Sequence, residues 1–428
     1  MNYKESLDWL YSFERFGIKL GLERIKHITK KLNDLHKNYK IVHVAGTNGK
    51  GSVCKVIASI LIESGYKTGV YTSPHIQRFS ERITIDNKEI SDEKIVSLVE
   101  KIKPIVDEMI KNNDPPTFFE IVTAMAFQYF SDENVDFAVV EVGLGGTYDA
   151  TNIVEPIVSV ITNVSLEHTD VLGKTIKEIA LQKAGIIKDN VPVVTAAEND
   201  VLDVIKKVAK EHKASVNVVN RKMWVRTSFN SSGQEFQIKG TLADYHVKTP
   251  MLGNHQGENI ALAIVTVENL QINGVYIPEA SIIDGVAKAT NPGRLEIVKN
   301  DPIILLDGAH NPAGMKVLKD ALEDFEHDKL ILVIGILSDK DINSMLSIIV
   351  PIADVIVLTK SHNNRACEPS KLNEIIEKAG YKKKVVIKDQ IPDAVKYAES
   401  IAKKNDLVCV TGSLFTVGET REYLLKNT

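Results

Sequence analysis

The stretch KIVHVAGTNGKGSVCKVIASILIESG, from Lys40 to Gly65, decides how the fold begins. Its opening KIVHVA is a nearly continuous apolar run, which is typical of a strand buried on both faces of a sheet. The closing SVCKVIASILIESG has helical periodicity and a glycine near its end. The glycine-rich segment between them is therefore predicted to connect a strand directly to a helix.

This connection has the features of a phosphate-binding loop. Gly46, Gly49 and Gly51 let the backbone approach a phosphate closely, and successive N–H groups at a helix start hold anions. Lys50 adds a cation for the β- and γ-phosphates, and Ser52 adds a hydroxyl for phosphate or metal. The alternative is a glycine-rich turn without a ligand, which the flanking strand and helix disfavour.

The loop departs from the standard Walker A pattern G-x-x-x-x-G-K-[ST]. That pattern requires glycine at position 44 and Ser or Thr at position 51, and the chain has Val44 and Gly51. The loop sequence therefore indicates a nucleotide site of a family other than the standard Walker A proteins.

Composition excludes several classes of protein. The 428 residues are 44% hydrophobic and 25% charged, which favours a well-packed globular chain of two domains. A formal net charge of -4 gives no general reason to expect nucleic acid or an anionic membrane as partner. Cys54, Cys367 and Cys409 are odd in number and far apart, which favours a reducing compartment. No apolar signal core or membrane-spanning run is evident, so we expect a cytoplasmic protein. Nothing in the sequence demands a partner chain, so we expect a monomer.

The N-terminal part predicts α/β architecture. Residues 1–40 are expected to be helical with a turn at GIKLGLERI, and strands then alternate with helices as a parallel sheet requires. The expected strands are KIVHVAG, TGVYTS, FAVVEVG, PIVSVITNV and VPVVTA, and the expected helices include TFFEIVTAMAFQYF and TIKEIALQKAGIIK. Residues 214–250, with SVNVVN, KMWVRTSFN and QEFQIKG, predict a small antiparallel meander.

A second, smaller domain is expected after NPGRLEIVKNDP (291–302), which has two prolines and a glycine and is interpreted as a linker or hinge. Beyond it, strands and helices alternate again, which predicts a Rossmann-like fold. We therefore expect a P-loop domain over residues 1–296 and a Rossmann-like domain over residues 297–428.

Polar residues follow several predicted strands, at the sheet edge where ligands bind in α/β proteins. Glu141 follows FAVV and suits Mg²⁺, which prefers oxygen ligands; a helix cap or a lysine partner is the alternative. From the residues alone, His168 and Ser73 are more simply turn or cap residues. Lys183 is likewise more simply a solvated surface lysine.

The loop spelling AGTNGKGS resembles that of the Mur ligase superfamily, and most closely its folylpolyglutamate synthase/dihydrofolate synthase branch. Further stretches resemble the same family in order along nearly the whole chain: TSPHIQRFSERITI (72–85), VEVGLGGTYDATN (140–152), SLEHTDVLGKTIKEIALQKAGIIK (165–188), PGRLE (292–296), LDGAHNP (306–312), SDKD (338–341) and VTGSLFTVGE (410–419).

The resemblance implies a three-substrate ligation. A folate or dihydropteroate carboxylate takes the γ-phosphate of ATP, and the amine of L-glutamate displaces phosphate to form an amide. The implied metal residues for two Mg²⁺ ions are Ser73, Glu141, His168 and a carbamylated Lys183, and the implied catalytic residues are Lys50, His168 and Lys183. Carbamylation requires a deprotonated amine, so burial is expected to lower the pKa of Lys183.

The resemblance also implies the binding residues. ATP is assigned to Gly46, Thr47, Asn48, Gly49, Lys50, Gly51, Ser52, Asn259, Arg294 and Asp307, with His310 positioning nucleotide or glutamate. Arg294 lies in the hinge segment, so its contact with nucleotide would depend on domain closure. Asp339 and Lys340 are weaker candidates, for which a plain loop is an equal interpretation.

The pterin end is assigned to Phe118, Phe119, Tyr148 and Asp149, with the GLER turn at 21–24. The alternative for both phenylalanines is the core, because TFFEIVTAMAFQYF has helical spacing. Many family members carry arginine where this chain has Thr147, and that departure puts the substrate contacts in doubt.

Three other functions are the alternatives. A cell-wall Mur ligase acting on a UDP-linked peptide usually carries an additional N-terminal domain, and only about 40 residues precede the loop here. A P-loop switch or motor would hydrolyse ATP without glutamate and would have a standard Walker loop. A nucleotide-binding module without chemistry would leave Glu141, His168 and Lys183 without a role.

Overall fold

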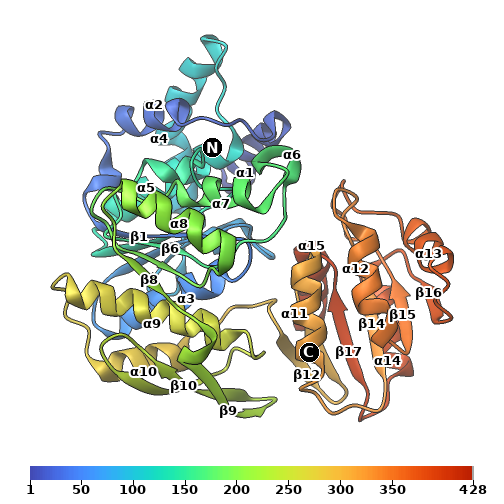
Figure 1. Cartoon of the computed structure of the whole chain (residues 1–428). Coiled ribbons are helices and arrows are strands. Elements are labelled where there is room, and N and C mark those ends of the chain that lie inside the picture. Colours follow the sequence, from blue (N-terminus) through green and yellow to red (C-terminus); the bar gives the residue numbers. More distant parts are fainter. Residues whose placement is uncertain (427–428) are drawn as a thin grey trace. The chain divides into compact units, whose positions relative to one another are not determined.

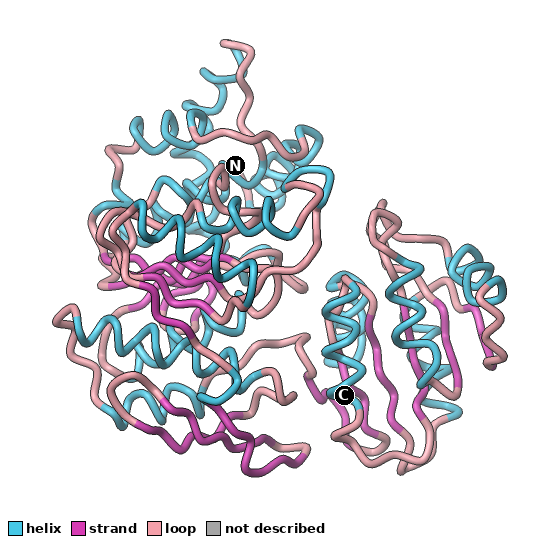
Figure 2. The backbone as a smooth tube through the Cα atoms, in the orientation of Figure 1, coloured by secondary structure: helices cyan, strands magenta, loops and turns pink. Residues whose placement is uncertain are grey.

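The structure is a computed structural model that describes residues 1–426, and it has two compact units, each with its own sheet (Figures 1 and 2). The larger unit comprises Met1–Val225, Phe236–Lys248 and Gly257–Ala289. The smaller unit comprises Arg226–Glu235, Thr249–Gln256 and the chain from Thr290 onward. The predicted boundary between residues 296 and 297 stays a prediction.

The larger unit is built on an eight-stranded sheet with the order β4-β3-β2-β5-β1-β6-β7-β8. β1 lies between β5 and β6 and is parallel to both, and the antiparallel pairs are β2–β3 and β3–β4 at one edge. The strands predicted from apolar runs are therefore confirmed. The bounds are β1 Lys40–Ala45, β2 Thr68–Tyr71, β3 Ile83–Ile85, β4 Lys88–Glu89, β5 Phe137–Glu141, β6 Val158–Ile161, β7 Val193–Thr195 and β8 Val216–Val218.

Helices cover both faces of this sheet. Figure 1 shows α5, α7 and α8 on one side and α3, α9 and α10 on the other. The helices of the unit are α1 Tyr3–Tyr11, α2 Glu23–Lys31, α3 Lys50–Glu63, α4 Asp92–Lys111, α5 Phe118–Asp132, α6 Thr169–Leu172, α7 Ile176–Ala184, α8 Asn199–Glu211, α9 Gln256–Ile272 and α10 Glu279–Lys288.

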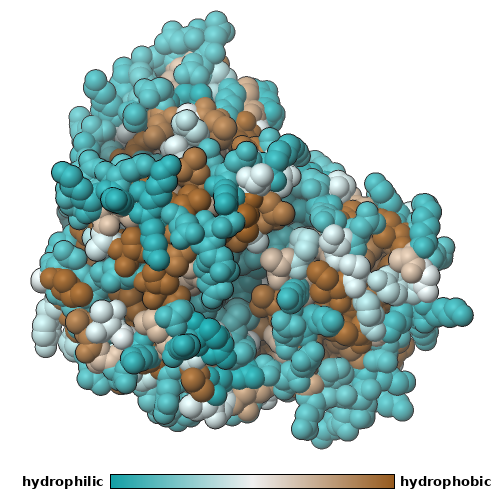
Figure 3. Space-filling model, in the orientation of Figure 1, coloured by the Kyte–Doolittle hydropathy of each residue, from teal (hydrophilic) through white to brown (hydrophobic). Residues whose placement is uncertain are grey.

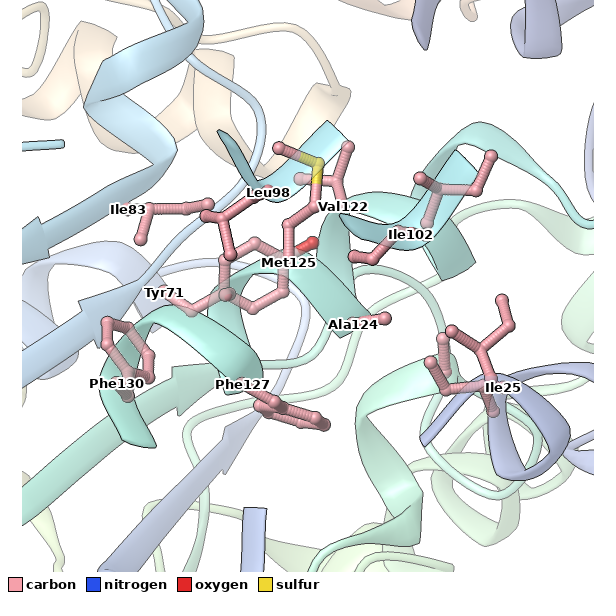
Figure 4. Close-up of a cluster of buried hydrophobic side chains, with 14 of the residues drawn as sticks. Ile25, Tyr71, Ile83, Leu98, Ile102, Val122, Ala124, Met125, Phe127 and Phe130 are labelled. Carbon is pink, nitrogen blue, oxygen red and sulfur yellow. The ribbon is translucent and has the colours of Figure 1, made fainter. Parts of the chain in front are cut away.

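The main core of the larger unit lies between the sheet and α1, α2, α4 and α5. Figure 4 shows Tyr71 and Ile83 of the sheet beside Met125 of α5 and Leu98 of α4. All four side chains are buried, so an apolar layer from α4 and α5 packs against the strands beside the predicted site.

The prediction of an antiparallel meander starting near residue 214 was wrong for its first strand. SVNVVN contains β8, which pairs in parallel with β7. The reason is that α8 lies between β7 and β8 and supplies the crossover connection that parallel strands need. The separate three-stranded sheet consists instead of β9 Trp224–Asn230, β10 Gly233–Lys239 and β11 Asp244–Thr249.

The smaller unit has a six-stranded sheet with the order β12-β13-β17-β14-β15-β16, parallel except for β12. The bounds are β12 Glu296–Asn300, β13 Ile303–Leu306, β14 Leu330–Ile334, β15 Val355–Leu358, β16 Lys384–Ile387, β17 Leu407–Thr411, α11 Pro312–Leu322, α12 Ile342–Ile349, α13 Pro369–Lys378, α14 Ile391–Ile401 and α15 Leu414–Lys426. The linker expected over 291–302 is thus partly a strand, because β12 pairs antiparallel with β13 and protects that edge.

The surface agrees with the composition. The face drawn in Figure 3 is largely hydrophilic, with hydrophobic residues scattered among polar ones. In the described part of the chain, no helix combines the length and apolar character that crossing a membrane requires.

The contact between α3 and α10 gives a test of the fold. A Cβ added at Gly285 of α10 would lie 2.5 Å from the Ile60 Cα of α3. We expect Gly285→Ala to lower Tm by several degrees, because overpacking costs about 1–3 kcal/mol and exceeds the ~1 kcal/mol that alanine gains in a helix. Thermal denaturation checks this against Asp284→Ala, an exposed position of the same helix, which is expected to leave Tm unchanged or higher.

Candidate active site

The glycine-rich loop lies between β1 and α3, as predicted, and its backbone requires two of its glycines. Gly46 and Gly49 have φ of 147° and 84°. A Cβ at Gly46 would lie 1.8 Å from Thr162 Oγ1, and one at Gly49 would lie 2.4 Å from Asn259 Oδ1. The sequence suggested that these glycines make room for a phosphate; the structure adds that neighbouring side chains already fill the Cβ positions.

The loop is held in place by the end of β6. The N–H of Thr47 donates to Asn163 O at 2.8 Å, and the N–H of Asn48 donates to Asn163 Oδ1 at 3.0 Å. Thr162 Oγ1 donates to Asn48 O at 2.7 Å. Asn163 and Thr162 were not among the predicted site residues, although both lie at the end of the predicted strand PIVSVITNV.

Lys50 closes the loop on itself. Its Nζ donates to the carbonyls of Gly46 and Thr47 at 3.0 and 3.1 Å. The N-cap of α3 is Gly49, which has no side chain that could cap the first turn. The helix start therefore offers backbone N–H groups and a nearby ammonium to an anion.

Ser73 and Glu141 meet at the carboxyl ends of two neighbouring strands. β2 and β5 are parallel, with Tyr71 opposite Val140. The Ser73 N–H donates to Glu141 Oε2 at 3.1 Å, and Glu141 is buried at the end of β5. Two predicted metal-side residues are therefore adjacent, and their carboxylate and hydroxyl oxygens suit a hard cation such as Mg²⁺.

Lys183 is not a surface lysine. Its residue is 1% exposed, and its Nζ donates to Gly46 O at 2.8 Å and to Glu167 Oε1 at 3.1 Å. Burial, opposed by Glu167, lowers the pKa of Lys183 to about 8. The interpretation as a solvated lysine was wrong because the sequence did not show that α7 packs its Lys183 face against the phosphate loop.

Glu167 is a residue of the site that sequence reasoning missed. Burial raises its pKa, but Lys183 and Lys50 outweigh this effect and lower the pKa of Glu167 overall. The available signal was its place directly before His168 in SLEHTD. Glu167 is thus the counter-ion of the buried amine.

His168 begins α6 in a left-handed conformation with φ of 47°. In the described part of the chain, no three His, Cys, Asp or Glu side chains form a group able to hold a metal ion. A metal role for His168 therefore depends on ligands of other kinds, and it stays a prediction.

Asp149 organises the loop after β5. Its carboxylate accepts the Leu144 N–H at 2.8 Å, the Thr151 N–H at 3.0 Å and the Thr151 hydroxyl at 2.5 Å. The same hydroxyl lies 2.8 Å from His43 Nε2. Burial raises the pKa of Asp149, and the hydrogen bonds, which lower the pKa, offset only part of this effect. Its contact with substrate stays a prediction, as does that of Tyr148, whose residue is 47% exposed.

Thr147 fastens the same loop to α7. Its N–H and Oγ1 donate to Gln182 O at 2.8 and 3.1 Å. Asn152 Nδ2 donates to Thr147 O and Gly185 O, both at 3.0 Å. Thr147 therefore holds the helix turn that carries Lys183 through its backbone and its short hydroxyl side chain.

Phe118 and Phe119 are core residues that pack against other aromatic rings. Phe118 stacks on Tyr11 with ring centroids 5.6 Å apart, and Phe119 stacks on Tyr71 at 5.9 Å. Phe118 belongs to the main core, and Phe119 packs against it. The core interpretation therefore holds for both, and their contact with a pterin stays a prediction.

The GLER turn is tied to α5 by a buried ion pair that sequence reasoning missed. Arg24 Nε lies 3.0 Å from Glu120 Oε1, and the two side chains are 14% and 3% exposed. Glu120 also caps the start of α5 with Thr117. The ion pair fixes the turn beside the two phenylalanines.

In the smaller unit, Arg294, Asp307 and His310 gather around Gly308. The Gly308 carbonyl accepts Arg294 Nη1 at 3.2 Å and lies 2.8 Å from His310 Nδ1. Asp307 accepts the N–H groups of Leu295 and Ala309. Burial raises the pKa of Asp307, and Arg294 opposes it. Their roles toward nucleotide or glutamate stay predictions.

The other two candidates of the smaller unit form an ion pair. Lys340 Nζ lies 3.2 Å from Asp339 Oδ2, and Arg365 Nη1 lies 3.6 Å from the same oxygen. These contacts account for both residues within their loop.

Known protein families match both parts of the chain. Residues 44–267 match the Mur ligase middle domain, and residues 293–414 match the Mur ligase glutamate ligase domain. The dihydrofolate synthase/folylpolyglutamate synthase of Bacillus subtilis is 37% identical over 432 residues, which cover 99% of each chain. The chain belongs to the folylpolyglutamate synthase family of Mur ligases.

Solved members of the synthase family have the same fold. The Mycobacterium tuberculosis folylpolyglutamate synthase, complexed with ADP and AMPPCP, superimposes with a TM-score of 0.92 at 32% identity and 99% coverage of both chains. The Thermotoga maritima folylpolyglutamate synthase superimposes with a TM-score of 0.87 at 38% identity. The match covers 100% of this chain and 97% of the Thermotoga chain. The predicted fold class is thus confirmed.

The glycine at the start of α3 gives a second test. We expect Gly49→Ala to lower the free energy of unfolding by about 1–3 kcal/mol more than Gly65→Ala. Both positions have nearly equal φ, 84° and 87°, but only Gly49 meets another side chain, Asn259. Urea unfolding measures both, and adding Asn259→Ala to Gly49→Ala is expected to restore part of the loss. Equal losses in the two single variants would contradict the close contact.

Proposed function

We infer that this chain is an ATP-dependent ligase that adds L-glutamate to a pteridine carboxylic acid through an acyl phosphate. We propose tetrahydrofolate and dihydropteroate as substrates, because the Bacillus subtilis relative is named both a folylpolyglutamate synthase and a dihydrofolate synthase. The observation that carries the inference is the 2.8 Å hydrogen bond from Lys183 to Gly46, which brings the predicted carbamate position to the phosphate loop.

The proposed reaction has two bond exchanges. A carboxylate oxygen of the acid bonds to the γ-phosphorus as the bond to the bridging oxygen of ATP breaks, which gives an acyl phosphate and ADP. The glutamate nitrogen then bonds to the acyl carbon, phosphate leaves and the nitrogen loses its proton. At ~4 Å two like charges repel by roughly 4 kcal/mol at an effective dielectric near 20, so the site needs cations.

Several groups of this chain suit that need. The N–H groups at the start of α3 and the ammonium of Lys50 are proposed to hold the β- and γ-phosphates. Ser73 and Glu141 are proposed to hold one Mg²⁺, and His168 and carbamylated Lys183 a second. When bound, magnesium supplies positive charge to the phosphate oxygens.

Lys183 suits carbamylation in two respects. Its pKa, lowered by burial to about 8, leaves a sizeable neutral fraction near neutral pH. A carbamate nitrogen also keeps one N–H, which can continue to donate to Gly46 O. The new carboxylate would face Glu167, so we propose that the product is stable only with a cation between them.

ATP contacts are proposed for Asn259, Arg294 and Asp307, and His310 is proposed to position nucleotide or glutamate. Substrate contacts are proposed for Phe118, Phe119, Tyr148 and Asp149. We further propose a cytoplasmic monomer. The three cysteines are all buried and unpaired in the structure, which suits a reducing compartment.

The function is tested in one assay with ATP, Mg²⁺ and labelled glutamate, offering tetrahydrofolate and dihydropteroate separately. We expect label to enter a pteridine product with release of one phosphate per glutamate. Lys50→Ala is expected to reduce turnover by at least about 100-fold, because a charge aimed at the phosphates is removed. Hydrolysis of ATP that does not depend on glutamate would instead indicate a P-loop NTPase of another kind.

The role of Lys183 is tested by carbon-13 NMR with labelled bicarbonate. We expect a carbamate signal in the native protein, its loss in Lys183→Ala and a decrease of activity by roughly 100-fold or more. Short-chain carboxylates are expected to restore part of the activity. Lys177→Ala, at an exposed lysine of the same helix, is the control and should keep the signal. A native protein without the signal would contradict the proposed second metal site.

A further inference from the structure

Arg82 is a buried cation at the edge of the candidate site. It ends the 3₁₀ helix Phe79–Arg82 and is 8% exposed. Its carbonyl accepts the Thr72 N–H at 3.0 Å, so it lies beside the carboxyl end of β2, next to Ser73. None of the predicted roles includes this residue.

The contacts of the Arg82 guanidinium leave its charge unpaired. Nε donates to His75 Nδ1 at 2.8 Å, and Cζ lies 5.3 Å from the centre of the Phe118 ring. Within residues 1–426, the guanidinium makes no other hydrogen bond, and no carboxylate oxygen lies within 4.0 Å of its nitrogens. Because the Arg82 Nε–H donates to His75 Nδ1, that ring nitrogen is an acceptor without a proton and the imidazole is neutral.

Three other partly buried arginines of this chain are paired with carboxylates. Arg24 contacts Glu120, Arg226 contacts Asp324 and Arg421 contacts Glu296. A buried charge without a partner is strongly unfavourable. The single bond to His75 uses one of five N–H donors, so the Nη groups of Arg82 are available to an acceptor that the chain does not itself supply.

The surroundings of Arg82 define that acceptor. On one side, Phe118 and Tyr11 form a stack of flat rings. On the other, the neighbouring strand end carries Ser73 and Glu141. A ligand that combines aromatic rings with a carboxylate could place its rings beside Phe118 and Tyr11. Its carboxylate would then lie at the Arg82 guanidinium. A planar guanidinium binds a carboxylate through two parallel hydrogen bonds.

We propose that Arg82 binds a carboxylate of the pteridine acid substrate, with Phe118 supporting the guanidinium. The proposal rests on the proposed function and adds a specificity residue to it. The carboxylate has two sources: the reacting group, which dihydropteroate also has, or the α-carboxylate of the terminal glutamate, which only the folate has.

The test measures binding without turnover. Isothermal titration, in the absence of nucleotide and glutamate, compares dihydropteroate, tetrahydrofolate and their carboxamide analogues on the native chain and on Arg82→Met. We expect the acids to bind about 10- to 100-fold more weakly to the variant, since hydrogen bonds to charged groups contribute about 1.5–3 kcal/mol, and the carboxamides to bind equally to both proteins.

The pattern among the acids identifies the source. Weakening of both acids indicates the reacting carboxylate, and weakening of tetrahydrofolate alone indicates the α-carboxylate. Equal weakening of acids and carboxamides, or no weakening of the acids, would overturn the proposal.

Two further variants separate binding from loop support. His75→Ala removes the hydrogen bond but keeps the charge, so acid affinity should change by less than about threefold; a loss as large as that of Arg82→Met would mean that Arg82 only braces the loop. Arg78→Met is the matched control, because Arg78 is exposed in the same segment and pairs with Glu89. A native chain that binds neither acid nor carboxamide would count against the proposed function itself.

Discussion

The hydrogen bond between the Lys183 amine and the Gly46 carbonyl is the constraint on which the site depends. It joins α7 to the loop between β1 and α3, which are far apart in the sequence. The loop itself is fixed by Asn163 and Thr162, and the end of α7 is fixed by Thr147. A shift of either element would break the contact, so the sheet edge holds the loop and the amine as one rigid assembly.

Several charged groups at this edge are paired or hydrogen-bonded by neighbouring residues, whereas in the described part of the chain the guanidinium of Arg82 has no carboxylate partner. Lys183 is balanced by Glu167, Arg24 by Glu120, and Asp149 by N–H and hydroxyl donors. Burial strengthens such interactions and penalises any charge without a partner. The unbalanced Arg82 next to the aromatic stack is therefore a feature of ligand binding in our interpretation, and the balanced groups are features of the apo scaffold.

Errors in the sequence predictions have a common physical origin. Lys183 was first interpreted as solvated, SVNVVN as part of the meander, and residues 296–300 as linker. In each case the local residues permit two environments, and a distant partner decides between them: the phosphate loop for Lys183, β7 for β8 and β13 for β12. Glu167, the Arg24–Glu120 ion pair and the burial of Arg82 were missed for the same reason, since a charged side chain carries no local mark of burial.

The sequence by itself determined the alternation of strands and helices, the glycine-rich turn at Gly46–Gly51 and the family, because these depend on local periodicity and on motifs read in order. Tertiary structure alone decided which charges lie in water and which lie beneath the loop. Burial and pairing are properties of elements packed against one another, and the pKa of an amine such as Lys183 follows from what surrounds it in space.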